Sequence, residues 1–118
     1  MSIRPLFAAL AVLALAGCAA DPAPNEQMRL TEQTLAQAKA VGATAEDVPE
    51  LKLAEDKFAR AQRNMQEQSF KHARMRAEQA ELDARLAEAR VLTLKSQEQL
   101  NMLQTRITRL RKQLGDAQ

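Results

Sequence analysis

The sequence predicts an all-α protein: an antiparallel helical hairpin or three-helix bundle whose long C-terminal helix extends as a coiled coil. Three observations predict this fold class. Apolar residues recur at spacings of three and four through residues 49–114, which places them on one side of a helix. The chain is rich in Ala, Leu and Gln and contains neither Trp nor Tyr. The 101 residues after residue 17 suffice for thin helices packed along seams, and not for a thick globular core.

The first 17 residues have the pattern of a secretion signal. Arg4 gives a short basic start, residues 6–16 are apolar, and small residues follow. These eleven apolar residues would span only about 16 Å as a helix, well below the roughly 30 Å hydrocarbon core of a bilayer. We therefore expect residues 1–17 to be a cleaved signal peptide and not a transmembrane helix.

Cys18, the only cysteine, directly follows Leu15, Ala16 and Gly17. These four residues resemble a bacterial lipobox. The resemblance implies a diacylglycerol on the Cys18 sulfur, cleavage before Cys18, and usually a third acyl chain, such as palmitate, on the new amino terminus. Three acyl chains hold a protein at a membrane far more firmly than one. This covalent lipid is the only non-protein group we expect; the alternative is a free thiol after an ordinary signal peptide.

The residue after Cys18 and the net charge of the mature part indicate where the protein lies and which partners it lacks. In enterobacterial lipoproteins, which the lipobox resembles, an aspartate after the acylated cysteine retains the protein in the inner membrane. Ala19 occupies that position, so we expect the periplasmic face of the outer membrane. The mature part carries 16 Lys and Arg against 15 Asp and Glu, because Arg4 leaves with the signal peptide. This balance, without aromatic residues among the basic ones, gives no support for a nucleic-acid partner.

Residues 18–25 are rich in proline and predict a flexible, lipidated tether. We expect a helical bundle over 26–94 and a coiled-coil extension and tail over 95–118. The first helix of the bundle should begin with Asn25 as its cap and run to about Val41, where Gly42 stops it.

The second helix should begin at Pro49, which needs no hydrogen-bond partner for its nitrogen in a first turn. Asp47 and Glu50 flank it at the spacing of a capping box, in which each side chain accepts from the other's backbone N–H. The apolar side of this helix consists of Leu51, Ala54, Phe58, Ala61 and Met65.

Two apolar stripes decide how the chain continues. The spacing of the second helix runs on through residue 114, which taken alone predicts one long rod. A second stripe lies on a different side of the helix and begins only at residue 70; it consists of Phe70, Ala73, Ala77, Ala80, Ala84, Ala87, Val91 and Leu94. A helix with two apolar sides has two neighbours. We therefore expect a turn near residues 66–69, with Ser69 as a cap, the second helix on the alanine side and the first helix in the other groove. No glycine or proline marks this turn, so the rod stays open as the alternative.

The end of the third helix has no expected partner within the chain. Its apolar residues form a heptad seam of Leu100, Leu103, Ile107, Leu110 and Leu114. We expect a coiled coil with another copy or with a partner helix; the alternative is a frayed amphipathic end. Basic residues accompany this seam: Arg106, Arg109, Arg111 and Lys112. They suit the negative end of the helix dipole, and would also suit contact with anionic cell-wall polymer or an acidic partner.

The sequence predicts no enzyme, no metal site and no catalytic residues. His72 is the only histidine, and an acylated Cys18 could not join it in a metal site or a nucleophilic pair. Acidic neighbours such as Glu78 and Asp83 are expected on solvated helix faces, because a thin bundle offers no desolvated cleft that would shift their pKa values. The chain also has no glycine-rich loop of the kind that binds phosphate.

The order of these features resembles one family of bacterial lipoproteins. The features are the lipobox, the break at Gly42-Ala43, the helix start Pro49-Glu50-Leu51-x-x-Ala54, and the alanine run Ala73…Ala77-Glu78-Gln79-Ala80…Asp83-Ala84-x-Leu86-Ala87. Up to about Val91 they are similar to the uncharacterised lipoproteins of the domain-of-unknown-function family numbered 4398. The resemblance implies a helical fold and assigns no catalytic residues. Some similar proteins carry an added peptidoglycan-binding domain of the outer-membrane-protein-A type, for which we expect no room here.

These observations together predict a lipid-anchored periplasmic helical protein that acts as a structural spacer, scaffold or protein-interaction module of the cell envelope, near peptidoglycan. The alternative is a regulatory lipoprotein that recruits or activates a cell-wall enzyme. The two differ in whether the exposed seam binds another copy or a different protein.

Overall fold

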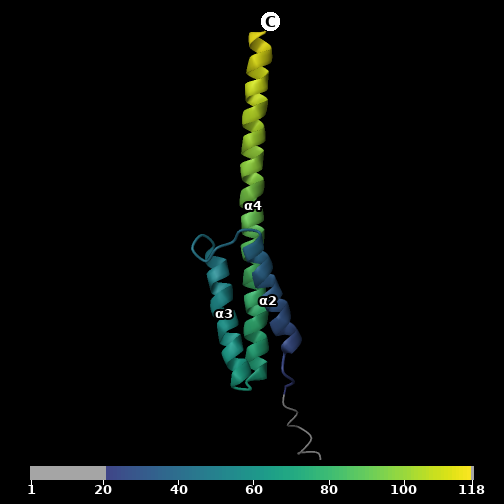
Figure 1. Cartoon of the computed structure of the whole chain (residues 1–118), viewed down its shortest axis with the longest axis vertical. Helices are drawn as coiled ribbons and strands as arrows, with labels where there is room; N and C mark the ends of the chain where they lie inside the picture. Colours follow the sequence, from purple (N-terminus) through teal and green to yellow (C-terminus); the bar gives the residue numbers. More distant parts are fainter. Residues whose placement is uncertain (1–20, 118) are drawn as a thin grey trace, which may run out of the picture.

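A computed structural model describes residues 21–117, which form three helices and no strand. The helices are α2 (Asn25–Ala40), α3 (Pro49–Gln66) and α4 (Phe70–Asp116). Figure 1 shows α2 and α3 lying along the first half of α4, whose second half projects alone. The predicted all-α class with a long C-terminal helix is confirmed, and the hairpin rather than the rod is the correct alternative. The predicted signal peptide, the predicted lipobox and Cys18 lie outside the described residues.

The turn between α3 and α4 occupies Glu67 to Ser69, within the range that the second stripe predicted. Gln68 takes a left-handed backbone conformation with φ of 57°. Such a conformation costs a non-glycine residue roughly 1–2 kcal/mol. Backbone hydrogen bonds close the turn, among them one from Ser69 N to Asn64 O at 2.8 Å. Burial of the alanine side of α4 against α3 offsets the strain, so the chain turns back without glycine or proline.

The core follows the alanine stripe of α4, which we define as Ala73, Ala77, Ala80, Ala84 and Ala87. All five side chains are fully buried. Alanine side chains are small, so neighbouring helices approach the backbone of α4 closely. The hydroxyl of Thr31 in α2 shows how closely, because it donates to the backbone oxygen of Ala77 at 3.0 Å. From α3, Leu51 and Ala54 complete the buried cluster.

The placement of α2 differs from the prediction. We expected the first helix to fill a groove on the side of α4 away from the alanine stripe. Instead α2 and α3 both pack on that stripe and also contact each other, with Lys39 Nζ 2.6 Å from a carboxylate oxygen of Glu55. A narrow alanine ridge leaves room for two helices side by side, and the threonines of α2 fit there. The large apolar residues on the opposite side of α4 therefore stay exposed.

The helix starts also differ from the sequence prediction. Pro24, not Asn25, occupies the cap of α2, and its carbonyl accepts from Met28 N at 3.0 Å. Val48 occupies the cap of α3, so the predicted capping box of Asp47 and Glu50 does not form. Val48 is buried, and burial of its apolar side chain outweighs the hydrogen bonds that a carboxylate cap would make.

The remaining predicted boundary residues are found at helix ends. Ser69 is at the cap of α4, yet its hydroxyl lies 2.9 Å from Nδ1 of His72 and makes no capping hydrogen bond. Gly42 follows the end of α2 with φ of 101°, a conformation that side chains disfavour. Gly42 N donates to Lys39 O and Ala43 N to Ala38 O, which closes the end of the helix.

The second half of α4 extends beyond the bundle. The helix has 47 residues and is therefore about 70 Å long. Val91 is its last buried residue, and all described residues after it are exposed. Lys95 makes the final contact with the bundle, donating from Nζ to the Val41 backbone oxygen at 2.6 Å. Within residues 21–117, no helix combines the length and the apolar character needed to cross a membrane.

Candidate interaction surface along α4

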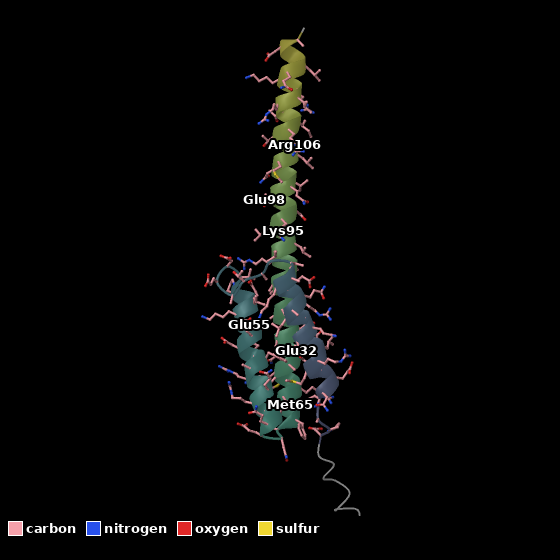
Figure 2. All side chains as sticks on the ribbon, viewed as in Figure 1. Glu32, Glu55, Met65, Lys95, Glu98 and Arg106 are labelled. Carbon is pink, nitrogen blue, oxygen red and sulfur yellow. The ribbon has the colours of Figure 1, made fainter. Side chains whose placement is uncertain are left out.

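The five predicted seam residues lie together on the projecting half of α4. We call this group, which consists of Leu100, Leu103, Ile107, Leu110 and Leu114, the tail seam. Each of these side chains is between 48% and 71% exposed. Figure 2 shows the side chains of this half, with Glu98 and Arg106 labelled, extending from a helix that no other element covers. The tail seam is therefore an apolar surface without a partner in the described chain.

The same heptad frame continues into the bundle, where it forms a second exposed group. Met75, Leu82 and Leu86 are 41%, 66% and 55% exposed. We call these three residues the bundle seam. It lies on the side of α4 nearly opposite the alanine stripe, because the two sets differ by about half a helical turn. Ala89, Thr93 and Ser96 link it to the tail seam in the same frame.

Together the two seams and the small residues between them form one surface, the α4 seam, over residues 75–114. The sequence pattern contained every one of these residues. The bundle seam was nevertheless missed as a surface, because we assigned its side of α4 to the first helix. Only the packing of α2 on the alanine stripe shows that this side is open.

The charges that flank the α4 seam differ between its two halves. In this heptad frame the seam residues alternate between position a, as at Leu100 and Ile107, and position d, as at Leu103 and Leu110. The flanking positions are g, directly before each a, and e, directly after each d. Along the tail seam they contain arginine and glutamine and no acid; they are Gln97, Gln99, Gln104, Arg106, Arg111 and Gln113. Along the bundle seam they include two acids, Glu78 and Asp83. Lys57 of α3 contacts only one oxygen of Asp83, Oδ2, at 2.5 Å.

Polar contacts fix α2 and α3 to α4 and so keep the seam side open. Arg90 of α4 pairs with Glu50 of α3 at 2.6 Å. The backbone N–H of Glu50 and, next, Arg90 hold the pKa of Glu50 below its usual value, although partial desolvation opposes the shift. On the other flank, Gln27 of α2 donates to Glu81 Oε2 at 2.7 Å. That hydrogen bond, with Arg85 beside it, lowers the pKa of Glu81 against the opposing effect of desolvation.

Acid is expected to weaken the contact between α2 and α4. Because the folded state lowers the pKa of Glu81 below its usual 4.5, the unfolded chain binds this proton more tightly. The stabilisation is complete above about pH 5 and is lost as the pH falls through the folded-state pKa. It amounts to no more than about 1 kcal/mol for such a partly exposed group.

Melting curves at about pH 5 and about pH 3, followed by circular dichroism, would check this effect. Glu81→Gln should reduce the fall in melting temperature, whereas Glu98→Gln, on the exposed half of α4, should leave it unchanged. An equal fall in all three proteins would contradict the assignment to Glu81.

In the described part of the chain, the geometry of α4 suits the binding of a partner along the seam, and no reactive side chains cluster there into a catalytic site. His72 contacts Ser69 and lies exposed at the turn. Residues 21–117 contain no group of three or more His, Cys, Asp or Glu side chains placed to hold a metal ion. The depressions found on the projecting half are lined by side chains of α4 alone, such as Asn101, Thr105 and Arg109. They are gaps between neighbouring side chains of one exposed helix.

Comparison with known proteins gives a family and a solved structure. The family model for the domain of unknown function DUF4398 matches residues 26–103, which include α2 after its first residue and all of α3, and end within the tail seam. A DUF4398 family protein from Pseudomonas aeruginosa is 66% identical to this chain in sequence, and its crystal structure superposes on this one with a TM-score of 0.79. The match covers 82% of this chain and 100% of that one. No curated protein matches. With a family match over most of its length and a solved relative of the same fold, the chain belongs to the DUF4398 family.

Proposed function

We propose that this protein is a lipid-anchored, non-catalytic component of the cell envelope, held through Cys18 at the periplasmic face of the outer membrane. In this proposal it acts as a helical spacer or scaffold, and the α4 seam is the surface through which it binds another copy or a different protein. The observation that carries the proposal is the exposure of the tail seam on a helix that projects alone from its bundle.

The exposed seam is energetically costly for a monomer. Full burial of a leucine or isoleucine side chain contributes about 1.5–3 kcal/mol, and each of the five tail-seam residues, 48–71% exposed, forgoes a large part of it. A contiguous apolar surface of this kind marks an interaction site more often than an accident of sequence. Beyond Val91, Lys95 of α4 hydrogen-bonds to the bundle, and the rest of the projecting half lacks the tertiary packing from which most helical stability in proteins comes. A partner helix along the seam would stabilise both the surface and the helix.

The lipobox and the path of the chain support the anchored part of the proposal. The chain enters α2 at the end of the bundle remote from the tip of α4 (Figure 1). An anchor at Cys18 therefore attaches to the bundle end and leaves the α4 seam uncovered. The basic side chains on the projecting half, such as Arg109 and Lys112, are exposed and suit contact with an anionic cell-wall polymer.

Aspartates in the tail seam are expected to abolish association. Light scattering on residues 19–118 should give the mass of an oligomer for the wild type and of a monomer for the double variant Leu103→Asp and Leu110→Asp. Charged side chains at the centre of the seam would have to be buried without partners, which costs several kcal/mol. A matched control, Leu94→Asp and Met102→Asp, adds two aspartates to the same half but away from the seam, and should stay oligomeric.

A wild-type monomer would overturn self-assembly. The seam would then serve a different protein, as expected of a regulatory lipoprotein that recruits or activates an envelope enzyme. An oligomer that the seam variant leaves intact would overturn the role of the seam itself. Circular dichroism of each variant shows whether the helices are retained, and so separates lost association from unfolding.

A further inference from the structure

We propose that the partner of the α4 seam is a second copy of this chain, packed antiparallel so that the tail seam of each copy lies on Leu82, Leu86 and the small residues between the two seams of the other. The inference rests on the proposed role of the seam in association and adds the identity, orientation and register of the partner. In this arrangement residues 82–114 of the two copies overlap, and the twofold axis passes near Glu98.

The shape of the bundle permits this arrangement. Both α2 and α3 pack on the alanine stripe, which lies nearly opposite the seam. A second helix therefore has room along the seam over residues 82–114 without displacing either of them. The bundles of the two copies lie at opposite ends of the pair. Such a contact uses the same surface on both copies and closes at two.

The sizes of the seam residues favour antiparallel packing. In a parallel pair each seam residue faces its own copy, so three successive layers would contain only Ala89, Thr93 and Ser96. Those layers would leave voids where a well-packed coiled coil needs large side chains. In the antiparallel pair the large residues of the tail face the small ones. The layers are Ala89 with Ile107, Thr93 with Leu103, Ser96 with Leu100, Leu86 with Leu110, and Leu82 with Leu114.

The flanking charges select the same orientation. In a parallel pair, a residue at position g faces the residue five places later in the other copy, at position e. That geometry sets Arg106 against Arg111 and Arg85 against Arg90, on both sides of the pair. Like charges at these positions oppose pairing. In the proposed antiparallel pair, Arg111 instead faces Asp83.

Asp83 is equipped for this second contact. Lys57 contacts Oδ2 of Asp83, which leaves Oδ1 for the guanidinium of Arg111 in the other copy. Three of the remaining flanking pairs match arginine with glutamine or leucine, two match a glutamine with itself, and none sets like charges against each other: they are Arg85 with Gln113, Arg90 with Gln104, Leu92 with Arg106, Gln97 with Gln97 and Gln99 with Gln99.

The charges also fix the register. A shift by one heptad in one direction brings Arg85 opposite Arg106. A shift in the other direction brings Arg90 opposite Arg111, and a shift that pairs the two tail seams with each other brings Arg106 opposite itself. The proposed register is the one among these that combines filled layers with no repulsive flanking pair. Specificity of this kind comes from excluding alternatives as much as from the favoured contact.

Disulfide cross-linking tests the orientation, because residues 19–118 contain no cysteine. Two single variants, Ala89→Cys and Ile107→Cys, are purified separately, mixed while reduced and then oxidised. The proposed layer places the two new thiols within reach of a disulfide, whereas equal positions in the two copies lie about 27 Å apart along the axis. We expect the mixed disulfide to form at least about tenfold faster than the disulfide of either variant alone.

Controls distinguish register and folding. Ala89→Cys mixed with Leu100→Cys represents the shift by one heptad and should cross-link poorly. Leu86→Cys mixed with Leu110→Cys samples another layer of the proposed register and should cross-link well. Light scattering of each reduced variant shows whether it still forms the wild-type oligomer. If a substitution in the first pair blocks association, Leu86→Cys mixed with Leu110→Cys tests the register instead.

The outcomes separate this inference from the proposed function. Disulfides in the single variants, or preferential cross-linking of the shifted pair, would overturn the antiparallel arrangement while leaving the seam as an association surface. A dimer in which neither predicted mixture cross-links would do the same. A wild-type monomer would overturn the second copy as partner and indicate a different protein on the seam.

Discussion

Replacing Cys18 with alanine is expected to release the protein from membranes. If the lipobox resemblance is correct, the thiol of Cys18 carries the diacylglycerol on which the later processing depends, so the variant receives no lipid. Each buried CH₂ of an acyl chain contributes about 0.8 kcal/mol to membrane binding, so three chains hold the protein at the membrane far more firmly than one. Fractionation of cells should show the membrane-bound share falling by more than about tenfold, together with loss of labelling by radioactive palmitate.

A second variant checks the destination. Ala19→Asp keeps Cys18 and should keep the palmitate label, while a density gradient should show it shifting from the outer to the inner membrane if the enterobacterial sorting pattern applies. Membrane attachment of the Cys18→Ala protein at the wild-type level would contradict the lipid anchor, whatever its behaviour in solution.

Leucine in place of Ala84 is expected to destabilise the bundle strongly. Ala84 has no exposed surface and lies in the buried cluster that contains Leu51 and Ala54 of α3. Three added carbon atoms would force the helices apart, at a cost of about 1–3 kcal/mol or more. For a folded unit of this size, that corresponds to a decrease of roughly 4–8 °C in melting temperature per kcal/mol.

The matched control is Ala89→Leu, the same chemical change five residues later. Ala89 is exposed on the seam side of α4, so the added side chain meets no packed helix within the monomer and should change stability by less than about 0.5 kcal/mol. Thermal unfolding of both variants in the background of Leu103→Asp and Leu110→Asp keeps association from contributing. Similar melting temperatures for the two variants would contradict the packing of α2 and α3 on the alanine stripe.

Helical periodicity predicted the buried face of α4 correctly from Ala73 to Val91, because a stripe of alanines makes sense only if another helix covers it. The last residue of the predicted stripe, Leu94, lies beyond the bundle and is 61% exposed. Periodicity could not decide which helix covers which side. The leucines on the far side, Leu82 and Leu86, are more hydrophobic than the alanines, so they were the more plausible contact for α2. In the structure α2 instead approaches the backbone of α4 closely, as Thr31 does at Ala77, and both leucines stay exposed.

Local signals were less reliable than the stripes. The turn at Gln68 has no glycine or proline, and its left-handed conformation follows from the packing of α3 on α4 and not from its own preference. The start of α3 has a good capping sequence, yet burial of Val48 moves the cap by one residue. For the interaction surface, the heptad pattern predicted the tail seam, whereas its extension over Met75 to Leu86 required knowing where α2 lies.

The parallel course of α2 and α4 gives the fold a mechanical property. The described chain begins at one end of the molecule and finishes at the other (Figure 1), so tension between its two ends acts along the helix axes. Such tension slides α2 past α4 in shear. The contacts between them, from Thr31 with Ala77 through Gln37 with Glu88 to Val41 with Lys95, are then loaded together and not broken one after another. A bundle loaded in this geometry resists stretching, because several contacts carry the load at the same time. Its lifetime under force is set by the rate at which all these contacts open at once.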